Sequence, residues 1–154
     1  MGVLSAASGK SLWRGYEYYL EKKVLSYKQI SETVYEGTVS GNNGNVYHVH
    51  LDLEHPRKTT TCDCPLAKGK KIVCKHTVAL FFTIFPEEAK EYYRQVLEYE
   101  KEEEQRQQNL EIELARYIDG LSKPELKAAL YEVLYDSPEW VWDRFIRDHV
   151  EWKL

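Results

Sequence analysis

The chain of 154 residues lacks several features that define common protein classes. It has no uninterrupted apolar run of the roughly 18 residues that a membrane span requires, and no basic start followed by an apolar stretch. Glycine and proline are scarce, at eight and five residues, which excludes collagen-like and low-complexity chains. With 43% apolar and 30% charged residues, the chain can bury a core. We therefore expect a soluble protein of one or two compact units, located in the cytoplasm, or in the nucleus if eukaryotic.

Cysteine is also scarce, with only three in the chain. An odd number cannot all pair within one chain, and all three lie in the window from Cys62 to Cys74, so they make a poor disulfide framework. In a chain without an export signal, clustered thiols instead indicate a reducing compartment and metal binding.

The formal net charge of -4 conceals two segments of opposite sign. Up to Pro86 there are 11 Lys and Arg against 7 Asp and Glu, which gives +4, and beyond it 10 against 18, which gives -8. A positive segment can face an anion such as nucleic acid, whereas the acidic segment would repel one. We therefore predict two parts, a domain of residues 1–86 and an extension of residues 87–154.

The first part has the pattern of an α+β domain. A helix is predicted from Ser11, its expected N-cap, to Lys23, because apolar side chains recur at helical intervals. Three runs rich in β-branched and aromatic residues follow and predict an antiparallel sheet. These runs are 24–31, 33–40 and 46–54. The connection 41–45, Gly-Asn-Asn-Gly-Asn, contains residues that tolerate positive φ and predicts a tight hairpin.

The second part is predicted to be helical. An apolar helix over 77–85 ends at Pro86, where the next helix begins. No apolar residue occurs in 100–108, so this run is expected to be a solvated helix or a charged linker. Further along, Ser122-Lys-Pro-Glu125 has the sequence of a capping box and opens another helix.

The cysteine window supplies a complete set of zinc ligands, namely Cys62, Cys64, Cys74 and His76. Three thiolates and one imidazole form a tetrahedral set for Zn²⁺. Residues two apart in an extended backbone point to the same side, so Cys62 and Cys64 can reach one ion from the end of a strand. Residues two apart in a helix lie about 200° apart around its axis, so Cys74 and His76 require a helix that begins near Cys74. We predict a closed, structural zinc site.

The pattern of these residues, C-x-C, a spacer and C-x-H, resembles the SWIM-type zinc finger. The resemblance extends upstream to Gly37-Thr-Val-Ser-Gly and to 46–53, which are similar to the strand pair of bacterial members, and downstream to the segment 74–80, similar to the finger's helix. Together these cover residues 12–85. The resemblance implies a ββα arrangement in which a hairpin bears the first two ligands and a helix the last two. It also implies binding to DNA or to protein partners.

Cations surround the predicted zinc ligands, and Asp63 is the only acid between residues 57 and 76. Such a cluster is a candidate surface for phosphate. Its members are Arg57, Lys58, Lys68, Lys70, Lys71 and Lys75. We therefore expect nucleic acid, with DNA favoured, as the partner. The alternative is that these side chains only solvate a loop and offset the net negative charge of a three-thiolate zinc site.

Other functions are weighed against this one. The chain is expected not to be an enzyme, because a closed zinc shell leaves no open position and no nucleophile motif is present. Gly9-Lys10-Ser11 does not complete a phosphate-binding loop, since Leu4 stands where its first glycine belongs. A protein-interaction adaptor that uses the Trp-rich C-terminal helices is the main alternative, with Trp142 or Trp152 at the interface. A zinc redox switch also remains open.

Overall fold

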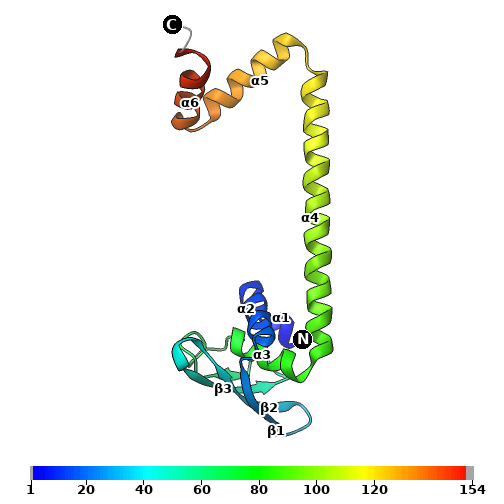
Figure 1. The fold of residues 1–154 in the computed structure, drawn as a ribbon, viewed down its shortest axis with the longest axis vertical. Coiled ribbons are helices and arrows are strands. Elements are labelled where there is room, and N and C mark those ends of the chain that lie inside the picture. The colour runs from blue at the N-terminus through cyan, green and yellow to red at the C-terminus, as the bar shows by residue number, and fades with distance from the viewer. Residues whose placement is uncertain (1, 152–154) are drawn as a thin grey trace. The chain divides into compact units, whose positions relative to one another are not determined.

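The computed structural model describes residues 2–151 and has two compact units, Met1–Leu97 and Glu98–Leu154. The first unit contains an antiparallel sheet and the second consists of helices (Figure 1), which confirms the α+β class. The boundary between the two units, after Leu97, falls within one helix, α4 (Pro86–Gly120). The change of charge at Pro86, where the sequence predicted the boundary, coincides with the start of that helix. Within residues 2–151, no helix combines the length and the apolar character needed to cross a membrane.

The chain opens with a short helix, α1 (Val3–Ala6), followed by α2 (Gly9–Leu20). The predicted start of α2 at Ser11 is wrong, because Ser8 is the N-cap and its Oγ accepts a hydrogen bond from the Ser11 backbone N–H at 3.2 Å. The helix also ends before Lys23. Lys22 adopts a left-handed φ of 54°, and the N–H of Lys23 returns to the carbonyl of Tyr18, which is the pattern of a Schellman motif.

Four antiparallel strands form the sheet in the order β1-β2-β3-β4. Their bounds are Val24–Gln29, Val34–Ser40, Val46–Asp52 and Thr61–Cys62. The first three correspond to the predicted strands, and β4 is a short addition that pairs with β3. The β2–β3 hairpin turns through a single 3-10 turn, Asn42–Gly44, in which Gly44 has a φ of 76°. One face of the sheet is buried and the other is polar, as the alternation in β3 predicts.

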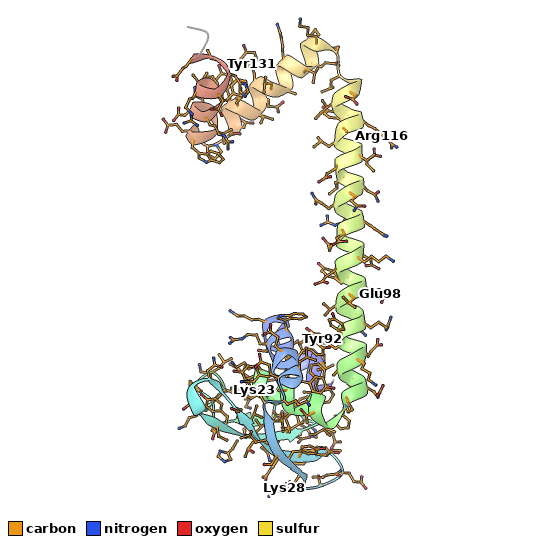
Figure 2. All side chains as sticks on the ribbon, viewed as in Figure 1. Lys23, Lys28, Tyr92, Glu98, Arg116 and Tyr131 are labelled. Carbon is orange, nitrogen blue, oxygen red and sulfur yellow. The ribbon has the colours of Figure 1, made fainter. Side chains whose placement is uncertain are left out.

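The core of the first unit lies between the sheet and two helices. Helix α3 (Lys75–Ile84) packs on the inner face of the sheet, and α2 packs on α3 (Figure 1). Leu80 and Phe82 are fully buried there, as expected for the apolar run 77–85. The first turns of α4 add Ala89 and Tyr92 to this core, and Figure 2 shows the long exposed course of the helix from Glu98 onward. The run 100–108 is part of this helix and is mostly exposed, as expected for a solvated helix.

In the second unit, α5 (Lys123–Asp136) and α6 (Glu139–His149) follow the end of α4. The predicted capping box is confirmed, because the Ser122 N–H donates to Glu125 Oε2 at 2.8 Å. Leu134 is the one buried residue among the described residues of this unit. Trp142 is half-buried with its ring 5.3 Å from that of Tyr135, and Trp152 lies outside the described residues.

Candidate metal centre

The four predicted ligands come from two adjacent elements of the first unit. Cys62 ends β4, where it pairs with Val49 of β3, and Cys64 follows two residues later. Cys74 is the N-cap of α3, and His76 lies in the first turn of that helix. Cys74 and His76 can face the same ion because Cys74 is not inside the helix. As the N-cap it has extended backbone, with φ -90° and ψ 174°. The hairpin-then-helix arrangement implied by the resemblance is therefore present.

These side chains form one buried cluster. Their ligand atoms all lie within 4.8 Å of one another, and the side chains are 3%, 2%, 0% and 3% exposed in chain order. His76 Nδ1 lies 3.8 Å from Sγ of Cys62 and 3.8 Å from Sγ of Cys74. Around a tetrahedral Zn²⁺, sulfur atoms are about 3.8 Å apart and sulfur and nitrogen about 3.5 Å apart. The donor geometry therefore fits zinc with Nδ1 as the fourth ligand.

The electrostatics of the cluster favour a bound cation. Hydrogen bonds from Cys62, His76 and Thr77 lower the pKa of Cys74 to about 3. The contact with Cys74 raises the pKa of Cys62, and burial raises the pKa of Cys64. Three thiolates at this separation repel one another in a medium of low polarity, so a divalent ion is required to balance them. Thiolate and imidazole ligands in a tetrahedral set are those of a structural zinc site.

The imidazole of His76 has one nitrogen without a partner. Its ring is packed against Tyr47 and Tyr18, with centroid distances of 4.5 and 5.5 Å. Within residues 2–151, buried Nε2 makes no hydrogen bond. With Nδ1 directed to the thiolates, Nε2 carries the proton of a metal-bound neutral imidazole and is a donor. His55 lies outside the cluster, and its Nδ1 is 3.9 Å from Asp52 Oδ2.

The six predicted cations do not share one site. Arg57 and Lys58 lie between β3 and β4, where Arg57 Nη2 donates to the carbonyl of Ser5 at 3.3 Å. Lys75 is the first residue of α3 and its Nζ donates to the Tyr18 hydroxyl at 2.6 Å. Three exposed side chains lie between β4 and α3, namely Lys68, Lys70 and Lys71. In the described part of the chain, none of the six makes an ion pair.

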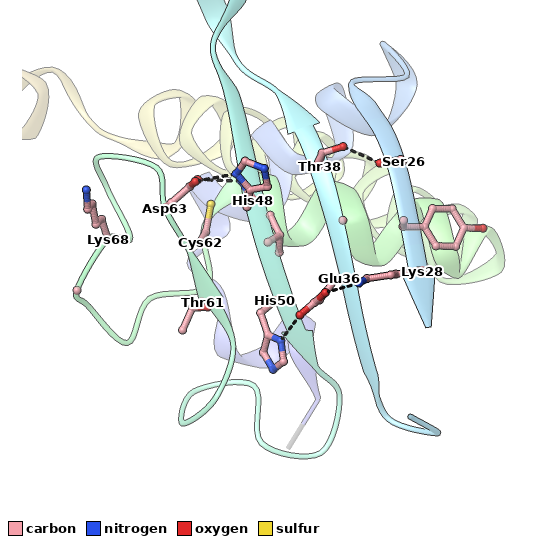
Figure 3. A pocket seen from close by; sticks show the side chains of 14 residues that line it. Ser26, Lys28, Glu36, Thr38, His48, His50, Thr61, Cys62, Asp63 and Lys68 are labelled. Atoms are coloured by element: carbon pink, nitrogen blue, oxygen red, sulfur yellow. Dashed lines mark hydrogen bonds and ion pairs between the residues drawn. The ribbon is translucent and has the colours of Figure 1, made fainter. Parts of the chain in front are cut away.

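A groove of about 830 Å³ crosses the polar face of the sheet (Figure 3). All of its charged groups except Lys68 are paired with one another. Glu36 lies 3.0 Å from Lys28 and 3.6 Å from His50, and these contacts, that with Lys28 above all, lower the pKa of Glu36. His48 Nδ1 lies 3.0 Å from Asp63 on the other side. The groove therefore presents a nearly balanced surface.

A second cavity, of about 570 Å³, lies beside the metal cluster. Cys64, Cys74 and His76 are part of its wall. Its cations are Lys10, Arg14 and Lys75, and no acidic residue lines it. Lys10 and Arg14 were not predicted from the sequence to be functional, although two cations four residues apart on a helix share one face, a pattern that could have indicated them.

Comparison with known families identifies the segment that carries the cluster. The family model described as SWIM zinc finger matches residues 47–85, which contain all four ligands together with most of β3 and all of α3. The predicted extension of the resemblance to residue 12 lies outside this match. No curated protein and no solved structure matches the chain.

Proposed function

We propose, from the premise that this chain carries a SWIM zinc finger at residues 47–85, that it is an accessory nucleic-acid-binding module with DNA as the favoured partner. Zinc has a structural role in it. With four protein ligands, the ion has no open position for a substrate, so the module is not an enzyme.

The observation that carries this proposal is the state of the cations on the finger. The side chains of Lys68, Lys70 and Lys71 are exposed, and none of them makes an ion pair within the described residues. The helices beyond Leu97 differ, because their arginines are paired with neighbouring acids, as Arg106 is with Glu103 at 2.7 Å. Cations whose charge is not offset by a neighbouring acid attract phosphate, and counterions are released when they bind it.

The zinc ligands also hold the loop that presents these lysines. Cys64 and Cys74 anchor its two ends, and Ala67 is buried at 2% exposure. The backbone N–H groups of Ala67 and Lys68 donate to the Cys64 carbonyl at 3.0 and 2.8 Å. A loop fixed at both ends loses little conformational entropy when it binds a strand. Metal binding and nucleic-acid binding are therefore expected to be linked.

A triple variant tests this function. Lys68→Ala, Lys70→Ala and Lys71→Ala together should weaken binding to duplex DNA, since each lost phosphate contact removes about 0.9 from the slope of log affinity against log salt. Fluorescence anisotropy across salt concentrations measures both quantities, and elemental analysis verifies that zinc is retained. The matched control replaces Lys101, Lys123 and Lys127, three exposed lysines outside the finger, and should leave the slope unchanged. An unaltered affinity and slope in the finger variant would contradict the proposal.

A second candidate is a protein-interaction adaptor that uses the helices after Leu97. It is favoured by the scarcity of buried side chains there, because Leu134 is the one buried residue among those described. Large apolar side chains remain exposed along α4, α5 and α6, including Leu114 at 58%, Tyr131 at 59% and Trp140 at 64%. Helices with so little buried surface are stabilised by a partner that covers them.

A further inference from the structure

The cavity beside the metal cluster has the composition of an anion site. It is lined by Lys10, Arg14 and Lys75 without an acidic residue, and in the described chain none of these three makes an ion pair. The sheet groove in Figure 3 is larger, but its two acids, Glu36 and Asp63, offset its two lysines, Lys28 and Lys68. Cys64 and Cys74 also line the cavity, but a zinc site with three thiolates carries a net charge of about -1, so the three cations leave this cavity the more positive of the two depressions.

His76 supplies a second and independent indication of a ligand. Its side chain is 3% exposed, it lines the cavity, and its Nε2 has no hydrogen-bond partner among the described residues. A metal-bound histidine ordinarily donates its other ring N–H to a carboxylate, a carbonyl or water. A buried donor without an acceptor costs about 1–3 kcal/mol. The cavity thus combines three cations with a donor that needs an acceptor.

The wall of the cavity is ordered by contacts of its own. Lys75 Nζ donates to the Tyr18 hydroxyl at 2.6 Å and lies 4.2 Å from the centre of the same ring. The Tyr18 hydroxyl in turn donates to Asn42 Oδ1 at 3.1 Å, which leaves the Asn42 amide nitrogen available as a donor. These contacts hold a cation and an amide at the rim in fixed positions.

Two helices also begin beside this cavity. Ala7 and Val73 form a parallel bridge directly before α2 and α3, so the N-termini of a 12-residue and a 10-residue helix start side by side. Helix N-termini carry partial positive charge and favour anions. This arrangement differs from a phosphate-binding loop, because no strand leads into Gly9-Lys10-Ser11.

We propose that this cavity binds a phosphate group, with Lys10, Arg14 and Lys75 balancing its charge and the zinc-bound His76 donating its Nε2–H to a phosphate oxygen. Phosphate suits the site because it offers several acceptor oxygens and more than one negative charge to three cations. The cavity volume of about 570 Å³ leaves space for an attached nucleoside. Where the phosphate belongs to a DNA strand, this inference rests on the proposed function, whereas a mononucleotide would bind independently of it.

The site can be tested on the zinc-loaded full chain with two phosphate sources, adenosine monophosphate and duplex DNA. Proton–nitrogen NMR of the histidine side chains observes the His76 Nε2–H directly, and this signal should shift on titration with either source. The double variant Lys10→Gln and Arg14→Gln should weaken binding of the responsive source at least tenfold while the zinc content stays unchanged. The matched control, Lys28→Gln with Lys90→Gln, removes two cations that are already paired with Glu36 and Glu87 and should have little effect.

The outcomes separate the two proposals. Binding of adenosine monophosphate with a shifted Nε2–H signal, but no binding of DNA, would support the phosphate site and contradict the nucleic-acid function. DNA binding that depends on Lys68, Lys70 and Lys71, with no shift of Nε2–H and no effect of the Lys10/Arg14 variant, would overturn the phosphate site and leave the function intact. A shift with DNA alone would support the site with a strand phosphate as its occupant.

Discussion

Cys74 has two roles, one for its backbone and one for its side chain. The backbone occupies the N-cap position of α3, while the buried thiol belongs to the metal cluster, where hydrogen bonds hold its pKa far below that of an ordinary cysteine. Its neighbours Cys62 and Cys64 have raised pKa values, so they lose their protons only when a cation is present to replace them. The residue-level chemistry therefore couples metal binding to the folding of the first unit.

Removal of one ligand should abolish zinc binding. Cys74→Ser and His76→Ala are expected to purify without stoichiometric zinc and to lose the cooperative thermal unfolding of the first unit, because structural zinc contributes about 10–16 kcal/mol in small fingers. His55→Ala is the control, since His55 lies outside the cluster. Elemental analysis and calorimetry with and without chelator measure the effect. Native protein that holds no zinc and unfolds identically in chelator would contradict the zinc site.

Asp52 organises the loop that follows β3. Its Oδ1 accepts hydrogen bonds from the backbone N–H groups of Glu54 and His55 at 2.8 and 3.0 Å, and its Oδ2 accepts one from the Thr59 hydroxyl. The bond from Thr59 is the main cause that lowers the pKa of Asp52 below the ordinary 3.8. The loop carries Arg57 and Lys58, so the carboxylate also sets the backbone that presents these cations.

Replacement of this carboxylate should destabilise the fold at every pH at which Asp52 is ionised in the unfolded chain. Asp52→Asn is expected to reduce the free energy of unfolding by about 1–3 kcal/mol at neutral pH. Because the pKa is lower in the folded than in the unfolded chain, the stabilisation is complete above the unfolded value of 3.8 and is lost as pH falls through the folded value. Urea unfolding of both proteins from pH 7 to 5 should thus give a constant difference. A difference that shrinks within this range would contradict the lowered pKa.

At the scale of elements, the contact between α2 and α3 positions the cavity. Gly15 lies where α2 crosses α3, and a Cβ added there would be 2.5 Å from Val78 Cβ and 3.0 Å from the Lys75 carbonyl. The helices can approach this closely only because the residue has no side chain. Their approach brings Lys10 and Arg14 of α2 to the same cavity as the start of α3.

Gly15→Ala should therefore be destabilising although alanine is the better helix former. Helix propensity alone favours alanine by about 1 kcal/mol, whereas overpacking of this contact costs about 1–3 kcal/mol and forces α2 away from α3. Gly9→Ala is the matched control, because a Cβ at Gly9 meets no atom within 4 Å. Thermal unfolding of the two zinc-loaded variants measures the contrast. If Gly15→Ala were as stable as the unaltered protein or more stable, the helices would not be in tight contact.

At the scale of the whole molecule, the chain joins a unit with a buried core and a buried metal-ligand cluster to helices that bury little. The first unit has a continuous core that includes Val39, Leu51 and Phe82. In the second unit, Leu126 and Leu130 remain 39% and 47% exposed, so they do not complete a core around Trp142. The net charge of -8 beyond Pro86 also makes this part unfavourable for binding nucleic acid, because like charges repel.

We predict that Trp142 takes part in association of the chain with a second copy. Trp142→Ala should weaken self-association in sedimentation experiments by about tenfold or more, as expected when an aromatic interface anchor is truncated. Zinc content and thermal unfolding of the first unit should not change. Trp13→Ala is the control, because Trp13 is 40% exposed on the first unit. A loss of stability with unchanged assembly, of the 3–5 kcal/mol typical of a core tryptophan, would contradict the interface.

Much of the candidate metal site could be predicted from the sequence, because its residues lie close together in the chain. The four ligands lie within 15 residues, and the periods of strand and helix decide which of them can face the same ion. The same holds for the three predicted strands, the start of α4 at Pro86 and the capping box at Ser122. The start of α2 was missed because Ser8 and Ser11 are equally good caps, and the backbone conformation at Ser8 decides between them.

By itself, the sequence determined which four side chains form the candidate metal cluster, the antiparallel α+β architecture and the change in charge near Pro86. Only the tertiary structure decided which cations act together. Lys10 and Arg14 are about sixty residues from Lys75 in the chain, and packing of α2 on α3 brings them to one cavity beside His76. Lys68, which is much nearer to Lys75 in the sequence, lines the groove on the other side of the sheet. Charge and ligand type are properties of residues, whereas a shared site depends on distances that only the folded chain fixes.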